Sequence, residues 1–328
     1  MIRVLGVVSM VLLTSCTGLP SFKPLPPLGP AHAVAEELFT LPDGARLPVR
    51  VWRPDGPVRG VVLALHGFND SRNAWVLPGP VLAADGLLVY APDQRGFGAA
   101  PGRGFWPGAA TLVSDAGAML QDLGRRHPGL PLYAMGESMG GAVLMTLAGQ
   151  DTRPALAGWI LLSPAVWDRE AQGAVLTSGL WLVTHTVPSL TVTGGEVPIR
   201  VMASDNRAAL IALARDPLTI RRTRFDGLSG LDDLMDMAQA AAARLPANTL
   251  VLYGAHDTLV PSGSVRRAWG AMPGSVRRGL YWGGYHLLLR DLGRRAPTQD
   301  VIAWTRDTAA WLPSGADFSA ASWWSTAR

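Results

Sequence analysis

Ser138 lies between two glycines in the segment Gly136-Glu137-Ser138-Met139-Gly140. This G-x-S-x-G spacing is typical of a serine held on a sharp strand-to-helix turn. A strand-like apolar run ends just before it, and residues 142–147 have the composition of a helix. Such a turn exposes the hydroxyl at a helix N-terminus, where the helix dipole favours negative charge. We therefore predict that Ser138 is a nucleophile that attacks a carbonyl carbon.

A serine nucleophile needs a base, and the chain has six histidines. His286 follows the last strand-like run, on a loop that two glycines, Gly283 and Gly284, make flexible. His32 lies in a proline-rich segment, and His66 lies in a loop that its ring would brace. His127 precedes a proline at a helix end, His185 lies in an insertion, and His256 lies beside a candidate acid. We predict that His286 is the base.

The third member of a triad is an acid that fixes the histidine tautomer and stabilises its cation. Asp257 follows directly after the strand-like run 250–254, and the chain order Ser138, Asp257, His286 is the serine–acid–histidine order known for this arrangement. Other candidates are predicted to be structural or to lie on a solvated helix face: Asp93, Asp232, Asp233 and Asp236. Asp257 is the predicted acid.

Acyl transfer also needs hydrogen-bond donors for the oxyanion. The segment Leu65-His66-Gly67-Phe68 ends an earlier strand-like run, so the backbone N–H of Phe68 is expected to lie near that of Met139. Losing one such donor costs about 10²–10³-fold in rate. Phe68 and Met139 are the predicted oxyanion hole.

The elements that must position these residues alternate between strands and helices. Helical spacing covers residues 111–126 and continues from Met139 onward. Strand-like runs occupy residues 47–52, 60–65, 87–91, 130–134, 159–162, 249–253 and 280–282. This alternation predicts an α/β fold with a mostly parallel central sheet covered by helices on both faces. Its core comprises residues 35–164 and 246–313.

The alternation breaks at residues 165–245, which are too many for a simple connection between strands. An apolar segment (174–187), a Gly194-Gly195 turn and two helical patterns predict a helical cap over one end of the sheet. Trp181 and Leu182 are candidate walls of an acyl-chain pocket, where each buried methylene is worth about 0.8 kcal/mol. The tail 314–328 has no clear pattern and stays unassigned.

Composition narrows the partners and cofactors. The chain has 328 residues, of which 48% are hydrophobic and 16% charged, and the net charge is +4. The basic residues are scattered arginines with the single Lys23, so no nucleic-acid partner is expected. Neither a zinc motif nor a phosphate-binding loop occurs, so no metal and no cofactor are predicted. The sequence leaves the oligomeric state open.

The first residues have the features of an export signal. Arg3 precedes an apolar run, 4–13, that is too short to span a bilayer. Cys16 follows small residues, is the sole cysteine, and makes the segment resemble the bacterial lipobox. That resemblance implies removal of residues 1–15, lipid attachment to Cys16 and a proline-rich tether, 16–34. The expected location is the bacterial cell envelope, anchored to a membrane and facing the periplasm or the exterior.

Residues 45–312 resemble the α/β-hydrolase superfamily, in its monoacylglycerol lipase, lysophospholipase and serine aminopeptidase branch. The motifs that carry the resemblance are His66-Gly67-Phe68, Asp93-Gln94-Arg95-Gly96-Phe97-Gly98, Gly136-Glu137-Ser138-Met139-Gly140-Gly141, Gly254-Ala255-His256-Asp257 with Val260-Pro261, and Tyr285-His286. Phe97 replaces the histidine that is usual in the second motif. The resemblance implies a helical cap and a catalytic site without a cofactor.

Three functions remain in view. The first is a serine hydrolase that cleaves carboxylic esters of small molecules or lipids, such as monoacylglycerol-like or lysophospholipid-like amphiphiles. The second is a serine peptidase or amidase, which needs a carboxylate for the substrate ammonium; Glu196 and the Asp232 group keep this open. The third, a non-catalytic binding protein, is disfavoured by the complete triad. Acyl-chain length and leaving group stay open.

Overall fold

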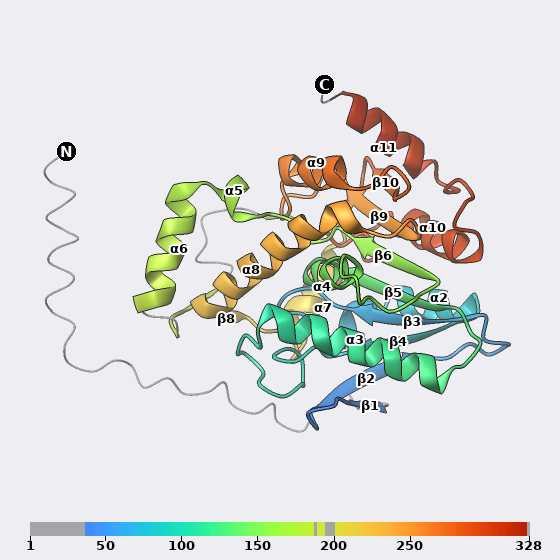
Figure 1. The fold of residues 1–328 in the computed structure, drawn as a ribbon, viewed down its shortest axis with the longest axis horizontal. Helices are drawn as coiled ribbons and strands as arrows, with labels where there is room; N and C mark the ends of the chain where they lie inside the picture. Colours follow the sequence, from blue (N-terminus) through green and yellow to red (C-terminus); the bar gives the residue numbers. More distant parts are fainter. Residues whose placement is uncertain (1–36, 187–188, 194–200, 327–328) are drawn as a thin grey trace, which may run out of the picture.

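A central eight-stranded sheet organises the computed structural model, which describes residues 37–186, 189–193 and 201–326 (Figure 1). Its spatial order is β1-β2-β4-β3-β5-β6-β9-β10. The strands are β1 (Glu37–Thr40), β2 (Arg46–Trp52), β3 (Gly60–Leu65), β4 (Leu87–Pro92), β5 (Leu132–Glu137), β6 (Gly158–Leu162), β9 (Thr249–Gly254) and β10 (Arg277–Tyr281).

Six neighbouring strands, from β4 to β10, are parallel, whereas β1 and β2 add an antiparallel edge. Every residue of β3, β4, β6 and β9 is buried, as their uninterrupted apolar sequences predict for strands covered on both faces. The predicted mostly parallel α/β sheet is therefore confirmed. Its parallel strands place their carboxyl ends at one edge.

Helices cover both faces of this sheet. The helices outside the insertion are η1 (Arg72–Trp75), α2 (Pro78–Ala84), α3 (Ala109–Arg126), α4 (Met139–Ala148), α9 (Ser262–Ala271), α10 (Arg295–Arg306) and α11 (Ala316–Ser325). Apolar residues of α3, α4 and α9 form one core with one face of the sheet. Those of α2 and α10 form a second core on the opposite face.

The chain between β6 and β9 contains both helices and a short hairpin. Its elements are α5 (Arg169–Gln172), α6 (Ala174–Thr186), β7 (Thr191–Thr193), α7 (Arg207–Arg215), β8 (Arg222–Arg224), α8 (Phe225–Ala241) and η2 (Ala242–Arg244). The antiparallel β7–β8 pair was not predicted. Figure 1 shows α5 and α6 at one end of the molecule, while the long helix α8 runs diagonally from them to the sheet layers.

The C-terminal half of α8 is part of the main core. Leu234 and Ala238 are buried in the same core as α3 and α4. A Cβ on Gly149, which caps α4, would lie 2.8 Å from the Cβ of Ala241, so the two helix ends pack backbone to backbone. The earlier part of the insertion, with α5 and α6, projects from this core (Figure 1).

Two further elements were not predicted from the sequence. Strand β1 pairs with β2, and the tail left unassigned forms helix α11 against the edge strand β10. Trp323 of α11 is buried beside Tyr253 and Trp269, with the guanidinium of Arg266 3.7 Å from its ring centroid. In the parts of the chain described here, no helix is both long and apolar enough to cross a membrane.

Candidate active site

Ser138 lies between β5 and α4 with its backbone in the left-handed region, at φ 54°. The flanking glycines make this turn possible. A Cβ on Gly136 would lie 2.4 Å from the carbonyl oxygen of Gly140, and a Cβ on Gly140 would lie 2.3 Å from that of Leu65. The spacing G-x-S-x-G is therefore dictated by close backbone packing, and it holds Ser138, only partly buried, at the carboxyl edge of the sheet.

Asp257 and His286 come together at the same edge. The Nδ1 atom of His286 lies 2.7 Å from Oδ2 of Asp257, and both side chains are buried. The other carboxylate oxygen, Oδ1, accepts the backbone N–H groups of Leu259 and Val260 at 2.8 and 3.0 Å. Because a carboxylate accepts, Nδ1 carries the proton and Nε2 is left as the basic atom.

The strand order explains why these three residues meet. Ser138 follows β5, Asp257 follows β9 and His286 follows β10, and these strands are parallel. The structure gives no hydrogen bond from the Ser138 hydroxyl to His286 among the described residues, a contact that commonly tightens only with substrate bound.

His286 is tuned by opposing effects. Burial alone would lower its pKa, but Asp257 and then Glu137 favour the imidazolium, so that the pKa lies above its ordinary value. Arg290 acts in the opposite direction. This environment stabilises the cation that a histidine base forms when it accepts a proton.

Phe68 and Met139 present backbone N–H groups beside the serine. As the first residue of α4, Met139 has an N–H without an intrahelical acceptor. The N–H of Phe68 donates to no other described residue. A Cβ on Gly67 would lie 3.3 Å from the Ser138 Cβ, so this loop runs directly against the nucleophile turn. The arrangement leaves both N–H groups available to an oxyanion.

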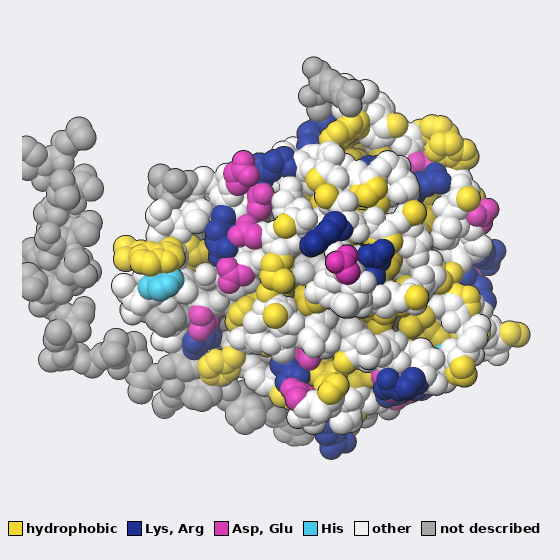
Figure 2. All heavy atoms as spheres, viewed as in Figure 1, with side chains coloured by type: hydrophobic (Ala, Val, Ile, Leu, Met, Phe, Trp, Pro, Cys, Tyr) yellow, Lys and Arg dark blue, Asp and Glu magenta, His cyan; other side chains and the backbone are white. Residues whose placement is uncertain are grey.

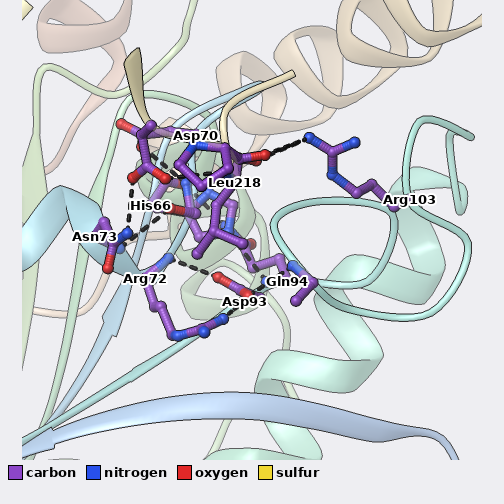
Figure 3. Close-up of polar contacts among 12 residues, drawn as sticks. His66, Asp70, Arg72, Asn73, Asp93, Gln94, Arg103 and Leu218 are labelled. Atoms are coloured by element: carbon purple, nitrogen blue, oxygen red, sulfur yellow. Dashed lines mark hydrogen bonds and ion pairs between the residues drawn. The ribbon is translucent and has the colours of Figure 1, made fainter. Parts of the chain in front are cut away.

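His66 braces the loop, as the sequence predicted. Its ring is fully buried, Nδ1 lies 2.8 Å from the carbonyl oxygen of Gly67, and Nε2 accepts the backbone N–H of Gln94 at 3.0 Å. The Gln94 side chain donates back to the His66 carbonyl at 2.7 Å. Burial lowers the pKa of His66, which keeps the ring neutral. Figure 3 shows this cluster.

Asp93 is structural, again as predicted. It accepts the backbone N–H of Arg72 and of Ala99 at 2.7 Å each, and its carboxylate pairs with the Arg72 guanidinium (Figure 3). The same carboxylate fills the space beside Gly98, where a Cβ would lie 2.2 Å from Cγ of Asp93. Phe97, in place of the usual histidine, is buried and packs edge-on against Phe68 at 5.5 Å. The turn therefore forms with Phe97 in place of the histidine, and Phe97 makes an apolar contact with Phe68 there.

Sequence reasoning missed a buried ionic cluster around Arg290. Its guanidinium pairs with Glu137, the residue before the serine, and with Asp70 at 2.8 Å, two residues after Phe68. All three side chains are buried. Arg290, on the loop that carries His286, thus connects the turn at Ser138 with the loop of Phe68. The four-residue spacing from His286 to Arg290 was visible, but nothing in the sequence identified its partners.

A second missed feature is the segment 202–206, which lies over the acid and histidine loops. The backbone N–H of Met202 donates to the hydroxyl of Thr258, next to Asp257, at 3.2 Å. The carbonyl oxygen of Ala203 accepts the backbone N–H of Leu287, next to His286, at 2.9 Å. Ser204 donates to Asp291 at 2.6 Å, and Asp291 in turn accepts the N–H of Tyr285 at 2.8 Å. The insertion therefore holds the loop that carries His286.

The rival acids do not join this site. Asp233 and Asp236 of α8 pair with Arg169 of α5, and Gln172 donates to Asp232 at 3.0 Å. The expectation of a solvated face was wrong for Asp232, which is buried because α5 covers it. Among the described residues, no group of histidine, cysteine or acidic side chains is arranged to hold a metal ion.

Trp181 and Leu182 lie on the surface of the insertion. Their side chains are 59% and 56% exposed on α6, and Trp181 stacks on His185, with ring centroids 4.3 Å apart. In Figure 2, hydrophobic side chains and a histidine protrude together where Figure 1 labels α6. Helix α6 contacts α5 and α8, and the role of Trp181 and Leu182 as a pocket wall stays a prediction. Cys16, Glu196 and the Gly194-Gly195 turn lie outside the described residues.

Comparison with known proteins agrees with this geometry. The family model described as serine aminopeptidase, S33 matches residues 56–293, which contain all three triad candidates. The chain belongs to this family. The monoacylglycerol lipase of Mycolicibacterium smegmatis is 28% identical to this chain over 286 residues, covering 82% of this chain and 96% of that protein. The mouse monoglyceride lipase is 28% identical over 265 residues, covering 76% and 82%.

A solved structure agrees on the fold. The soluble variant of Saccharomyces cerevisiae monoglyceride lipase, solved with a substrate analogue, superposes with a TM-score of 0.69 at 19% identity, covering 85% of this chain and 99% of that one. The S33 family member described here therefore has the α/β-hydrolase fold of the monoacylglycerol lipase and serine aminopeptidase branch.

Proposed function

We propose that this protein is a serine hydrolase that cleaves carboxylic esters, with Ser138 as nucleophile, His286 as general base and Asp257 as the acid that orients it. The observation that carries the proposal is the buried His286–Asp257 pair at 2.7 Å, on the same sheet edge as a serine held at φ 54°. Similarity to monoacylglycerol lipases supports ester rather than other acyl substrates.

The chemistry follows from the positions of the atoms. The Ser138 oxygen attacks the ester carbonyl carbon while its proton passes to Nε2 of His286. The N–H groups of Phe68 and Met139 stabilise the resulting oxyanion. The C–O bond then breaks, His286 returns the proton to the leaving alcohol, and an acyl-enzyme remains. Water, activated by the same base, releases the carboxylic acid and regenerates the serine. Asp257 stays ionised throughout.

The preferred substrates are monoacyl amphiphiles, resembling monoacylglycerols or lysophospholipids. Two observations support this class: the curated relatives are monoacylglycerol lipases, and Trp181 and Leu182 leave an apolar surface on the insertion. A lipidated Cys16 would place the enzyme where such amphiphiles are concentrated. The predicted location remains the bacterial cell envelope, facing the periplasm or the exterior.

Peptide or amide cleavage is the second candidate, because the matching family model is described as serine aminopeptidase. An aminopeptidase needs an unpaired carboxylate for the substrate ammonium. Asp233 and Asp236, the exposed acids of the α8 group, are paired with Arg169, which disfavours this role.

One purified enzyme assayed on two substrate series separates the candidates. We expect kcat/KM on glycerol monoesters to rise with acyl-chain length over the short-to-medium range, because each methylene removed from water is worth about 0.8 kcal/mol. Aminoacyl amides should be cleaved poorly. Faster cleavage of amides that requires a free substrate amine would reject the esterase proposal.

A further inference from the structure

A groove of about 750 Å³ lies apart from the serine, between helix α7, the η1–α2 connection and the segment that follows His286. Its apolar lining includes Val76, Leu77, Leu213 and Leu292. An adjoining hollow of about 290 Å³ shares Leu77, Leu292 and Arg294 with it and extends to Val81 of α2. Together they form a long channel open to solvent.

The apolar lining of this groove is unusually exposed. Leu292 is 66% exposed, and Val76 and Val81 are also exposed. Helix α7 does not seal the groove, since none of its residues is buried although residues 208–214 are all apolar. A contiguous exposed apolar surface on a folded domain commonly marks a binding site.

The charged residues of the groove are unbalanced. Of its two acids, Asp70 is paired with Arg290, whereas Asp216 accepts the neutral side-chain amide of Asn73 at 2.7 Å and keeps its charge. In contrast, Arg50 and Arg215 have no carboxylate partner within the described ranges. The groove thus combines an apolar lining with an excess of positive charge, because Arg50, Arg215 and Arg294 outnumber Asp216.

Arg294 extends this positive edge. Its guanidinium donates to the backbone carbonyl of Asp291 at 3.1 Å and has no carboxylate partner among the residues that the structure describes. It lines both the groove and the adjoining hollow, so an anionic group at either end of the channel would meet an arginine.

We propose that this groove binds a single-chain amphiphile with an anionic head group, its alkyl chain along Val76, Leu213 and Leu292 and its head at the arginines. The volume lies in the range of about 300–1,000 Å³ that is usual for sites of small ligands. A concave channel fits one chain, whereas a bilayer needs a flat or convex surface. A neutral head would leave the arginines unused, and a cationic head would be repelled.

The site differs from that of the proposed hydrolysis, because Ser138 does not line the groove, although Arg290 and Asp70 of the buried cluster do. Two sources share the required chemistry: a long-chain carboxylate, such as the acid released from an ester, and a lysophospholipid with a phosphate head. Both present an alkyl chain and an anion that arginine binds with charge-assisted hydrogen bonds. The test below treats them as separate arms.

The experiment uses the full chain carrying Ser138→Ala, so that binding is measured without turnover. A diazirine-bearing dodecanoate is photo-crosslinked, and labelled peptides are mapped by mass spectrometry, with a diazirine-bearing lysophosphatidic acid as the second arm. We expect crosslinks on peptides that contain Val76, Leu213 or Leu292. Arg50→Glu with Arg215→Glu should weaken binding by about tenfold or more, and added salt should weaken it further.

Two controls make the result decisive. Arg153 is exposed and does not line the groove, so Arg153→Glu should leave binding unchanged. The matched diazirine alcohol should label the groove much less than the carboxylate. Thermal melting checks that the arginine variants fold, and Arg50→Ala with Arg215→Ala replaces them if they do not.

The outcomes separate the possibilities. Stronger labelling by the phosphate arm identifies a lysophospholipid-like ligand, and stronger labelling by dodecanoate identifies a fatty acid; either supports the site. Labelling confined to peptides around Ser138, equal labelling by the alcohol, or no effect of the arginine variants would overturn the proposal. Ester hydrolysis by the unsubstituted enzyme is scored separately, so failure of one proposal does not mask failure of the other.

Discussion

Glu137 occupies the position immediately before the serine and is buried together with Arg290. Burial raises the pKa of this carboxyl, while Arg290 acts to lower it. The same carboxylate favours the cationic form of His286. Glu137, whose position the G-x-S-x-G motif leaves variable, therefore influences the protonation of His286, the proposed base.

The pH dependence of the enzyme follows from these charges. As the proposed base, His286 must be neutral to accept the serine proton, and its pKa is raised, so kcat/KM should rise through a midpoint above the ordinary value of about 6.5. The groups that act on it are Asp257, Glu137, Arg290 and Asp291. The measurement is kcat/KM on a soluble short-chain ester against pH, and a profile that stays flat well below this value, with the fold intact, would argue against a histidine base.

Glu137→Gln isolates one of these effects. It keeps the size of the side chain and removes its negative charge, so the pKa of His286 should fall and the acid limb should move to lower pH. Asp85→Asn, at the distant ion pair with Arg59, is the matched control and should leave the limb in place. An unmoved limb in Glu137→Gln would mean that the Glu137–Arg290 pair serves stability alone.

Arg290→Met should lower stability and activity more than Glu137→Gln does, because it leaves Asp70 and Glu137 buried without their partner. Breaking a buried ion pair in this way typically costs about 3–5 kcal/mol in the free energy of unfolding. We expect kcat to fall with little change in KM, and Arg290→Lys to recover part of the loss. Chemical denaturation and steady-state kinetics measure both effects. Wild-type kcat in folded Arg290→Met would contradict a positioning role.

At the scale of elements, the sequence predicted best where local pattern and tertiary role coincide. The buried runs of β3, β4, β6 and β9 read directly as strands because both faces are covered. The glycine spacing identified the turn at Ser138. The edge strand β1 escaped notice because it has only four residues, of which one is buried.

Helix α11 and the Arg290 cluster needed tertiary information. The tail sequence is small and polar apart from its aromatics, and its helix is stabilised by packing Trp323 against Tyr253 and Trp269 rather than by a local pattern. Likewise Arg290, Asp70 and Glu137 are far apart in the chain, so only the folded sheet edge reveals that they are partners.

Trp323→Ala tests whether α11 belongs to the folding unit. The side chain is only 7% exposed, so its removal should lower the free energy of unfolding by about 3–5 kcal/mol. Trp181→Ala is the control, since that residue of α6 is 59% exposed and its replacement should have little effect on stability. Equal stability of the two variants in urea unfolding would show that α11 is not integral to the core.

Considered as a whole molecule, the chain combines a hydrolase domain with an N-terminal segment that lies outside the described residues. If Cys16 is lipidated, the mature protein should fractionate with membranes and take up labelled fatty acid. Cys16→Ser should abolish both, while the domain expressed without residues 1–15 stays active. Sequencing the mature N-terminus provides the check, and any start other than Cys16 would disprove lipid attachment.

The central claim, that Ser138 is the nucleophile of an ester hydrolase, is tested most directly by a fluorophosphonate probe. The probe forms a covalent bond only with an activated serine, and peptide mapping locates that bond. We predict a single adduct on Ser138, complete loss of labelling and ester turnover in Ser138→Ala, and an unchanged melting temperature. An adduct on another serine, or labelling and turnover that persist in Ser138→Ala, would contradict the assignment.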